Sequence, residues 1–261
     1  MQRLVHAFMV GASALAIAAC HGARLTRADA NPAARHTARP KGTTAAANGF
    51  WEYLPARYTG TSKSPLLVFW HGIGENGTGT AEDLAKVPLF GPPHLISIGT
   101  WNATLPLVVL SPQHGPRGCP SADEIHDFMA FALTHYSVDS SRVYLSGLSC
   151  GALGSANYLA KYGGKQVVAS VLIAGNATAM WNARKCDLLR EVALWSFHGD
   201  ADRVVSITGN NTTMPNFMGC PAPRRAARYT VYPGVDHDSW SRTYDGSAGH
   251  DVYRWLLGIS R

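Results

Sequence analysis

Charged side chains are scarce in this sequence of 261 residues, and no long apolar run follows its first 19 residues. Lys, Arg, Asp and Glu make up 15% of the chain, whereas 46% of it is hydrophobic. This composition excludes a highly charged disordered chain, and the 26 glycines and 15 prolines follow no fibrous repeat. A chain of this length can bury a sizeable core, so we expect one globular domain.

Motifs for bound groups are also missing. The sequence has no zinc-like Cys/His spacing, no phosphate loop and no dinucleotide fingerprint, so we expect neither a metal nor a cofactor. Of the 23 basic residues, six lie in residues 1–47 beside one acidic residue, and the other 17 lie in residues 48–261 beside 16 acidic ones. Because the excess charge belongs to the N-terminal segment, the sequence does not indicate a nucleic-acid partner.

The N-terminus carries Arg3 and then an apolar stretch over residues 4–19. This pattern predicts an export signal over residues 1–20 rather than a membrane-spanning helix, because the stretch is short. It ends in Ile17-Ala18-Ala19-Cys20, which resembles a bacterial lipobox and implies a lipidated Cys20 that attaches the protein to a membrane. Ordinary cleavage nearby is the alternative. We therefore expect either a lipoprotein of the periplasm, outer membrane or cell surface, or a secreted protein.

Residues 21–47 lack helical or strand periodicity and predict a flexible linker, followed by a catalytic domain over residues 48–261. In that domain short apolar runs alternate with helix-like stretches, which predicts a mainly parallel sheet flanked by helices. The expected strands cover residues 50–54, 66–70, 107–110, 143–146, 167–173, 192–197 and 227–232. The expected helices cover residues 122–136, 150–161 and 251–257, with a further helix after Asp202.

The most informative motif is Gly147-Leu148-Ser149-Cys150-Gly151, a G-x-S-x-G sequence between a predicted strand and a predicted helix. Small residues on both sides of a serine allow the backbone to turn sharply and to present the hydroxyl above the sheet. This context predicts that Ser149 is a nucleophile. A tight turn with a capping serine is the simpler alternative.

A serine nucleophile needs a histidine base and a carboxylate that orients it. Both residue types follow predicted strands downstream, in His198-Gly199-Asp200-Ala201-Asp202 and in Asp236-His237-Asp238. Because the carboxyl ends of parallel strands lie at one edge of a sheet, these loops are expected to meet Ser149. The chain order nucleophile, acid, histidine then predicts Ser149 as nucleophile, an aspartate of the first loop as the acid and His237 as the base.

The acid loop resembles that of α/β-hydrolase esterases, including feruloyl esterases, polyhydroxyalkanoate depolymerase-like enzymes and bacterial relatives described as predicted peptidases. In those families the second aspartate of H-G-D-x-D is the triad acid, which corresponds here to Asp202. The resemblance thus implies the triad Ser149, Asp202 and His237, with Asp200 shaping the turn and His198 supporting the acid loop. The motifs extend from Trp70 to Trp240. The resemblance implies an α/β-hydrolase fold in a single domain, and the short spacing from Ser149 to Asp202 leaves little room for a large lid.

An oxyanion hole usually consists of two backbone N–H groups. The loop Trp70-His71-Gly72-Ile73-Gly74 resembles the H-G-x-G loop of the same esterases, so Ile73 and Cys150 are the expected donors. Cys150 departs from the family, where a larger apolar residue is expected, and either narrows the turn or pairs with another cysteine. Cys119, Cys150, Cys186 and Cys220 allow two disulfides in an exported protein. We expect Cys186 to pair with Cys220, because both flank the acid loop, and leave Cys119 and Cys150 open.

Together these features predict a serine hydrolase that cleaves carboxylic esters through an acyl-enzyme. The substrates expected are polysaccharide-linked acyl or feruloyl esters or polyhydroxyalkanoates, with Trp101, Trp181 and Trp240 as candidate lining residues. A serine peptidase that acts on short peptides is the alternative within enzymes. A non-catalytic binding lipoprotein of the same fold is the alternative from another class. The sequence leaves the acyl and alcohol specificity and the oligomeric state open.

Overall fold

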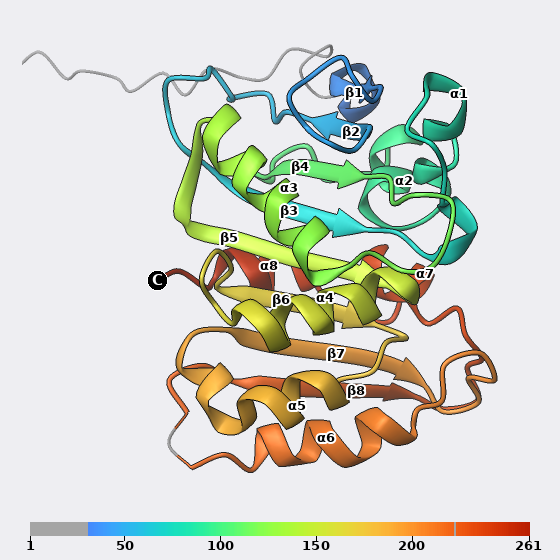
Figure 1. Cartoon of the computed structure of the whole chain (residues 1–261), viewed down its shortest axis with the longest axis vertical. Coiled ribbons are helices and arrows are strands. Elements are labelled where there is room, and N and C mark those ends of the chain that lie inside the picture. The colour runs from blue at the N-terminus through green and yellow to red at the C-terminus, as the bar shows by residue number, and fades with distance from the viewer. Residues whose placement is uncertain (1–30, 222) are drawn as a thin grey trace, which may run out of the picture.

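The computed structural model describes residues 31–261 except residue 222. Its centre is an eight-stranded sheet in the order β1-β2-β4-β3-β5-β6-β7-β8, in which β1 and β2 are antiparallel to their neighbours and the other strands are parallel. Figure 1 shows the parallel strands pointing the same way. The strands are β1 (His36–Arg39), β2 (Phe50–Tyr53), β3 (Ser64–Trp70), β4 (Val108–Pro112), β5 (Val138–Leu148), β6 (Ala169–Ile173), β7 (Ala193–Gly199) and β8 (Ala227–Tyr232).

Helices cover both faces of the sheet. One face packs against α3 (Ala122–His135), α4 (Cys150–Tyr162), α5 (Thr178–Arg184) and α6 (Thr208–Met218), and the other against α2 (Gly91–Ser97), α7 (Trp240–Tyr244) and α8 (Val252–Leu257). Short elements complete the chain: α1 (Ala81–Leu84) and the 3-10 helices η1 (Pro32–Arg35), η2 (Ile73–Glu75), η3 (Val87–Leu89) and η4 (Lys185–Arg190). The predicted fold class, a mainly parallel sheet flanked by helices in a single domain, is confirmed.

The central strands coincide with the short apolar runs of the sequence. Every residue of β3, β4, β6 and β7 is buried, because helices lie on both faces of the sheet, and such strands are continuously apolar rather than alternating. Helix α3 begins where the Ser121 hydroxyl accepts a hydrogen bond from the Glu124 N–H, 3.1 Å away. It buries residues spaced three and four apart, Ile125, Phe128, Met129 and Ala132.

The structure corrects the predicted boundary between linker and domain. Within the described residues, η1 begins at Pro32 and β1 pairs with β2, although residues 21–47 were expected to form a linker. Arg39 Nη2 lies 2.7 Å from Glu52 Oε1, and the Lys41 N–H donates to the Gly79 carbonyl at 2.8 Å. Strand β1 has no apolar pattern because it is a half-exposed edge strand that is held mainly through its backbone.

The remaining differences concern short elements. The predicted strands and longer helices are present with shifted ends, whereas α1, α2, α5 and α7, none longer than seven residues, were not predicted. The connection from β6 to β7 contains only α5 and η4. Leu188 and Leu189 of η4 are buried in the core, so this segment packs against the domain.

Candidate active site

Ser149 lies in a strained turn between β5 and α4. Its φ is +49° and its ψ is −116°, a conformation that costs a non-glycine residue roughly 1–3 kcal/mol. The flanking glycines make the turn feasible, because a Cβ on Gly151 would collide with the Trp70 carbonyl and a Cβ on Gly147 would lie 2.6 Å from the Gly151 backbone. The Ser149 N–H donates to the Ile173 carbonyl at 2.9 Å. The sequence pattern therefore produces the sharp strand-to-helix turn that it predicts.

Two residues from distant loops reach this serine. His237 Nε2 lies 2.9 Å from Ser149 Oγ, and His237 Nδ1 lies 2.8 Å from Asp202 Oδ2. The hydroxyl, the imidazole and the carboxylate thus form one continuous hydrogen-bonded line, and the structure brings the three predicted catalytic residues together. The edge of Trp240 packs against the His237 ring, with 4.9 Å between the ring centroids.

The Asp202 side chain is fully buried but well supplied with donors. Besides His237, its carboxylate accepts hydrogen bonds from the N–H groups of Val204, at 2.8 Å, and Val205, at 2.9 Å. Burial alone would raise the pKa of Asp202, but the hydrogen bonds from His237, Val205 and Val204 outweigh it and hold the pKa below its usual value. This carboxylate is therefore ionised at neutral pH.

A second histidine supports the same carboxylate. His198 is completely buried, and its Nε2 lies 3.1 Å from Asp202 Oδ2 and 2.9 Å from the Val205 carbonyl. Its Nδ1 accepts a hydrogen bond from the Asn210 amide at 3.0 Å, which leaves the ring proton on Nε2. His198 lies in the supporting position predicted for it. Asn210 was not predicted, because a single asparagine in the first turn of a helix carries no motif; its role follows from its burial, which only the structure shows.

Hydrogen bonds and an ion pair connect the acid loop, which contains Asp202, to the histidine loop, which contains His237. Asp200 Oδ1 accepts the Gly234 N–H at 2.6 Å, so Asp200 shapes the turn as predicted. Asp236 accepts the N–H groups of Arg203, at 3.1 Å, and His237, at 2.9 Å, and forms an ion pair with the Arg203 guanidinium. These contacts fix Asp202 and His237 relative to one another.

Each candidate oxyanion donor follows directly on a residue of the turn or of the loop that contacts it: Cys150 follows Ser149, and Ile73 follows Gly72. Cys150 and Ile73 are the first residues of α4 and η2, where backbone N–H groups have no partner within the helix. Gly72 lies against Ser149, because a Cβ placed on it would be 3.7 Å from Ser149 Cβ. The arrangement leaves two backbone donors at the same end of the sheet as the hydroxyl.

Buried polar residues stabilise the loop from His71 to Gly79, which contains Ile73. His71 Nδ1 donates to the Gly72 carbonyl at 2.6 Å, and its Nε2 accepts the His114 N–H at 3.0 Å. Burial lowers the pKa of His71 to about 4, so the ring is neutral. Gln113 donates to the carbonyls of Glu75 and Asp83 and accepts the Gly79 N–H. Neither role was predicted for His71 or Gln113, since the His71–His114 contact and the contacts of Gln113 join residues at least 30 positions apart in the sequence.

One of the two disulfides is attached to the Ser149 turn. Cys186 pairs with Cys220, as predicted. Cys119 pairs with Cys150, the residue directly after Ser149, so the departure from the family pattern at Cys150 is a cross-link that ties the start of α4 to the segment before α3. The four cysteines of the folded domain are thus all paired.

The three tryptophans considered as lining residues have separate environments. Trp240 contacts His237, whereas Trp181 packs edge-on against Phe217 at 5.1 Å between centroids, within the core formed by α5 and α6. Trp101 is buried and borders a cavity on the opposite face of the sheet. Cys20 and the export signal lie outside the described residues. Within residues 31–261, apart from residue 222, no helix has the length and apolar character that a membrane span requires.

The order of the strands and the turn at Ser149 define an α/β-hydrolase fold. Similar solved structures agree: a thermostable esterase (22% identity, TM-score 0.65, 87% of this chain and 63% of that one), Est1E from Butyrivibrio proteoclasticus (14%, 0.52, 85% and 98%) and an acylaminoacyl peptidase (13%, 0.52, 86% and 40%). The chain thus spans under two thirds of the first and the last of these proteins. No protein-family model and no curated protein matches the sequence.

Proposed function

We propose that this protein is a serine hydrolase that cleaves carboxylic esters, with Ser149 as nucleophile, His237 as general base and Asp202 as the residue that orients the base. The observation that carries the proposal is the unbroken hydrogen-bonded line from Ser149 Oγ through His237 to Asp202, which begins at a strained turn. Strain of this kind persists where the surrounding structure enforces it, and it concentrates at functional sites.

In the first half of the reaction, Ser149 Oγ attacks the ester carbonyl carbon while His237 Nε2 removes the hydroxyl proton. Asp202 stays ionised, holds the Nδ1 proton and stabilises the imidazolium that forms. The carbonyl oxygen becomes an oxyanion within reach of the N–H groups of Ile73 and Cys150. When the tetrahedral intermediate collapses, the C–O bond breaks and His237 Nε2 returns its proton to the departing alcohol.

In the second half, water replaces the alcohol. His237 Nε2 removes a proton from the water, whose oxygen attacks the acyl carbon of the Ser149 ester and forms a second oxyanion. Collapse of this intermediate breaks the bond between the acyl carbon and Ser149 Oγ, which regains a proton from His237. The carboxylic acid leaves, and no cofactor is consumed.

The surroundings of Ser149 favour an ester with an apolar or aromatic part. Ile73 and Val204, from the two loops that flank the candidate triad, expose 61% and 70% of their surface. Exposed aliphatic side chains beside a reactive group suit apolar contact with a substrate. Esters linked to polysaccharides through acyl or feruloyl groups, and polyhydroxyalkanoates, have this character. Several similar structures are esterases, which supports the ester class.

Hydrolysis of p-nitrophenyl esters from acetate to octanoate by the folded domain tests the proposal, together with labelling by a fluorophosphonate. We expect turnover and labelling in the wild type and a fall in kcat on the order of 10⁶-fold in Ser149→Ala. Ser260→Ala, at an exposed serine near the C-terminal end of the chain, serves as the control and should retain both. Absence of labelling in a wild type that is shown to be folded would reject the triad and favour a binding protein.

A peptidase remains the second candidate, because an acylaminoacyl peptidase is among the similar structures. Aminoacyl p-nitroanilides in the same assay distinguish the two. Ester cleavage with kcat/KM far above that of the matched anilide supports the esterase. Equal efficiency on both would assign a peptidase, because amides need a better-placed acid for the leaving group.

We also propose that the protein is exported and held at a membrane through a lipid on Cys20. The support is the lipobox-like sequence together with two disulfides, which form and persist in oxidising compartments. Cells that produce the full chain should incorporate a palmitate analogue into it, and Cys20→Ser should abolish the label. A labelled Cys20→Ser variant, or an unlabelled wild type that retains Cys20, would reject the anchor.

A further inference from the structure

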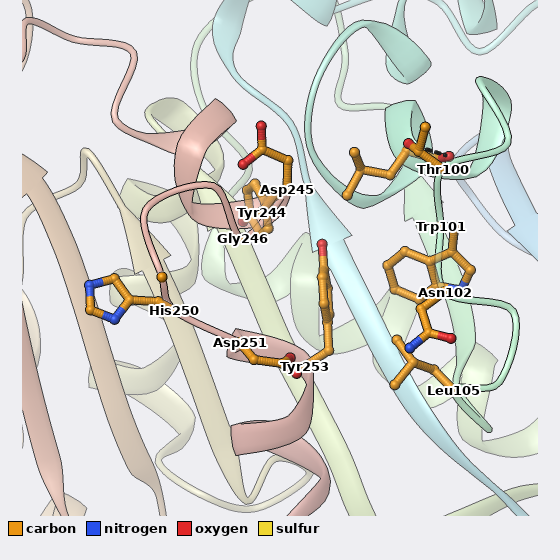
Figure 2. A pocket seen from close by; sticks show the side chains of 12 residues that line it. Thr100, Trp101, Asn102, Leu105, Tyr244, Asp245, Gly246, His250, Asp251 and Tyr253 are labelled. Atoms are coloured by element: carbon orange, nitrogen blue, oxygen red, sulfur yellow. Dashed lines mark hydrogen bonds between the residues drawn. The ribbon is translucent and has the colours of Figure 1, made fainter.

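A cavity of about 450 Å³ lies on the sheet face covered by α2, α7 and α8. Figure 2 shows it between the segment around Thr100–Leu105, which precedes β4, and the segment that joins α7 to α8. The aromatic residues Trp101, Tyr244 and Tyr253 border it, and none of Ser149, Asp202 and His237 does. Its volume falls within the range of small-molecule sites, about 300–1,000 Å³. The cavity is therefore a separate candidate binding site.

Two buried polar atoms of residues that border this cavity, Trp101 Nε1 and the Tyr253 hydroxyl oxygen, lack a hydrogen-bond partner within the described part of the chain. The Tyr253 side chain belongs to a residue that is 8% exposed, and its hydroxyl forms no hydrogen bond within the described part of the chain. In Figure 2 the hydroxyl projects into the space between Tyr244 and Trp101. Burial, together with the nearby Tyr244, Asp251 and Asp245, raises the pKa of Tyr253 well above its usual value, so the hydroxyl keeps its proton. A buried hydroxyl of this kind calls for an acceptor from a bound molecule.

The cavity offers acceptors as well as donors. Asp245 and Asp251 each use one carboxylate oxygen, to accept the N–H groups of Ser247, at 2.7 Å, and Arg254, at 2.9 Å. For their second oxygens no partner is found among residues 31–261 without residue 222. Asn102 accepts two hydrogen bonds from Thr104 through its carbonyl oxygen, and its amide group donates to no other residue of the described part of the chain. Hydrogen-bond donors, acceptors and aromatic side chains thus all belong to residues that border the cavity.

This combination selects the chemistry of the ligand. Two carboxylates border the cavity without a Lys or Arg, which disfavours phosphates, sulfates and uronic acids. An ammonium would satisfy the carboxylates but leave the Tyr253 hydroxyl and the Asn102 amide without acceptors. A hydroxyl group donates and accepts at once, and the C–H face of a sugar ring packs against aromatic side chains. A neutral sugar therefore offers partners both to the donors, which are the Tyr253 hydroxyl, the Trp101 Nε1–H and the Asn102 amide, and to the free carboxylate oxygens.

The position of the cavity relates it to the candidate active site. A second cavity, of about 530 Å³, shares Leu95, Thr100, Tyr244 and Asp245 with the first and is also bordered by Phe90. Phe90 packs against Trp240 at 5.8 Å between ring centroids, and Trp240 packs against His237. The two cavities therefore adjoin each other beside α7, and the packed side chains of Phe90 and Trp240 connect the second cavity to His237. A polymer held in these cavities would be kept close to Ser149.

We propose that the cavity bordered by Trp101, Tyr244 and Tyr253 binds a neutral sugar unit of a polysaccharide, as a site separate from the triad. The site would retain the protein on a glycan whose ester groups it removes. Its sugar-binding property does not depend on the proposed ester hydrolysis, although its biological use does.

Binding is tested with the Ser149→Ala protein, so that the result is independent of turnover. Isothermal titration uses xylopentaose, cellopentaose and mannopentaose as neutral probes, trigalacturonate as an acidic probe and spermidine as a cationic probe. We expect at least one neutral oligosaccharide to bind, and Tyr253→Phe, which removes only the hydroxyl, to weaken binding about tenfold. Tyr229→Phe is the matched control, because the Tyr229 hydroxyl contacts Asn211 outside the cavity. The Tyr229→Phe protein should bind the oligosaccharide as tightly as the Ser149→Ala parent does.

Asn102→Ala provides a second variant in case Tyr253→Phe folds poorly, since Asn102 is exposed. This substitution too should weaken binding of the neutral oligosaccharide. The proposal is overturned if no neutral probe binds, if only trigalacturonate or only spermidine binds, or if the folded Tyr253→Phe and Asn102→Ala proteins bind as tightly as the parent. Ester hydrolysis by the wild type is measured in parallel, so loss of sugar binding and loss of the proposed activity are distinguished.

Discussion

At the scale of single residues, two aspartates in one loop have different roles. Asp202 Oδ2 contacts His237, whereas Asp200 Oδ1 accepts the Gly234 N–H and contacts no candidate catalytic residue. Asp202→Asn would leave an amide where His237 needs an acceptor, and so would favour the wrong imidazole tautomer. We expect kcat to fall on the order of 10⁴-fold, measured with p-nitrophenyl acetate.

Asp200→Asn is the matched control, with the same chemical change two residues away. It removes at most one hydrogen bond, so kcat should change by less than about tenfold. If Asp200→Asn were the more damaging substitution, the assignment of the triad acid would move to Asp200 or fail. Melting temperatures of both variants check that each is folded.

His71 makes the free energy of unfolding depend on pH. Its pKa is about 4 in the folded protein, because burial disfavours the charged ring, and near 6.5 in an unfolded chain. Between these values the unfolded chain binds more protons, so the free energy of unfolding falls as the pH drops from about 6.5 to about 4. One such group contributes a loss of about 3 kcal/mol over the window.

Urea unfolding at intervals from pH 7 to pH 4 measures this loss. His71→Gln retains an amide donor and acceptor but cannot titrate, so its stability should depend less steeply on pH. His135→Gln, at an exposed position on α3, should follow the wild-type curve. An equally steep curve for His71→Gln would show that another group causes the loss.

At the scale of elements, the two disulfides close loops of nearly equal length but lie in different places. The paired cysteines are separated by 31 positions in Cys119–Cys150 and by 34 in Cys186–Cys220. Chain entropy therefore predicts a similar stabilisation of about 3–4 kcal/mol from each. Only the first bond is attached to the residue that follows Ser149.

Replacing both cysteines of one pair by serine separates stability from positioning. Cys119→Ser/Cys150→Ser and Cys186→Ser/Cys220→Ser should lose similar free energies of unfolding in urea titrations. The first variant should also lose roughly tenfold in kcat below its unfolding transition, because the start of α4 carries a candidate oxyanion N–H. An equal effect of both pairs on kcat would mean that the Cys119–Cys150 bond only stabilises the fold.

At the scale of the whole molecule, the sequence predicts the features that depend on residues close together in the chain. The G-x-S-x-G turn, the continuously apolar strands and the two downstream loops are local patterns, and each lies where it was expected. His71, Gln113 and Asn210 could not be assigned, because their contacts join residues far apart in the sequence. Strand β1 was not predicted for a related reason. It forms because it pairs with β2, and its own composition does not indicate a strand.

The N-terminal boundary of the folded domain is the feature on which sequence and structure differ most, and truncation tests it. A chain that begins at Asn31 keeps β1 and η1, whereas one that begins at Asn48 removes both and exposes the edge of β2. The shorter chain also loses Arg39, which pairs with the buried Glu52 at 2.7 Å; the Tyr136 hydroxyl would remain its donor. Losing one partner of a buried charge costs on the order of 3 kcal/mol.

We therefore expect the chain from Asn48 to melt about 6–12 °C below the chain from Asn31 and to aggregate more readily through the exposed edge of β2. Differential scanning calorimetry and light scattering of the two proteins at equal concentration measure both effects. Arg39→Met in the longer chain isolates the ion pair, since it removes the charge but leaves β1 paired through its backbone. Identical melting temperatures for the two truncated chains would place the boundary near Asn48, as the composition of residues 21–47 first suggested.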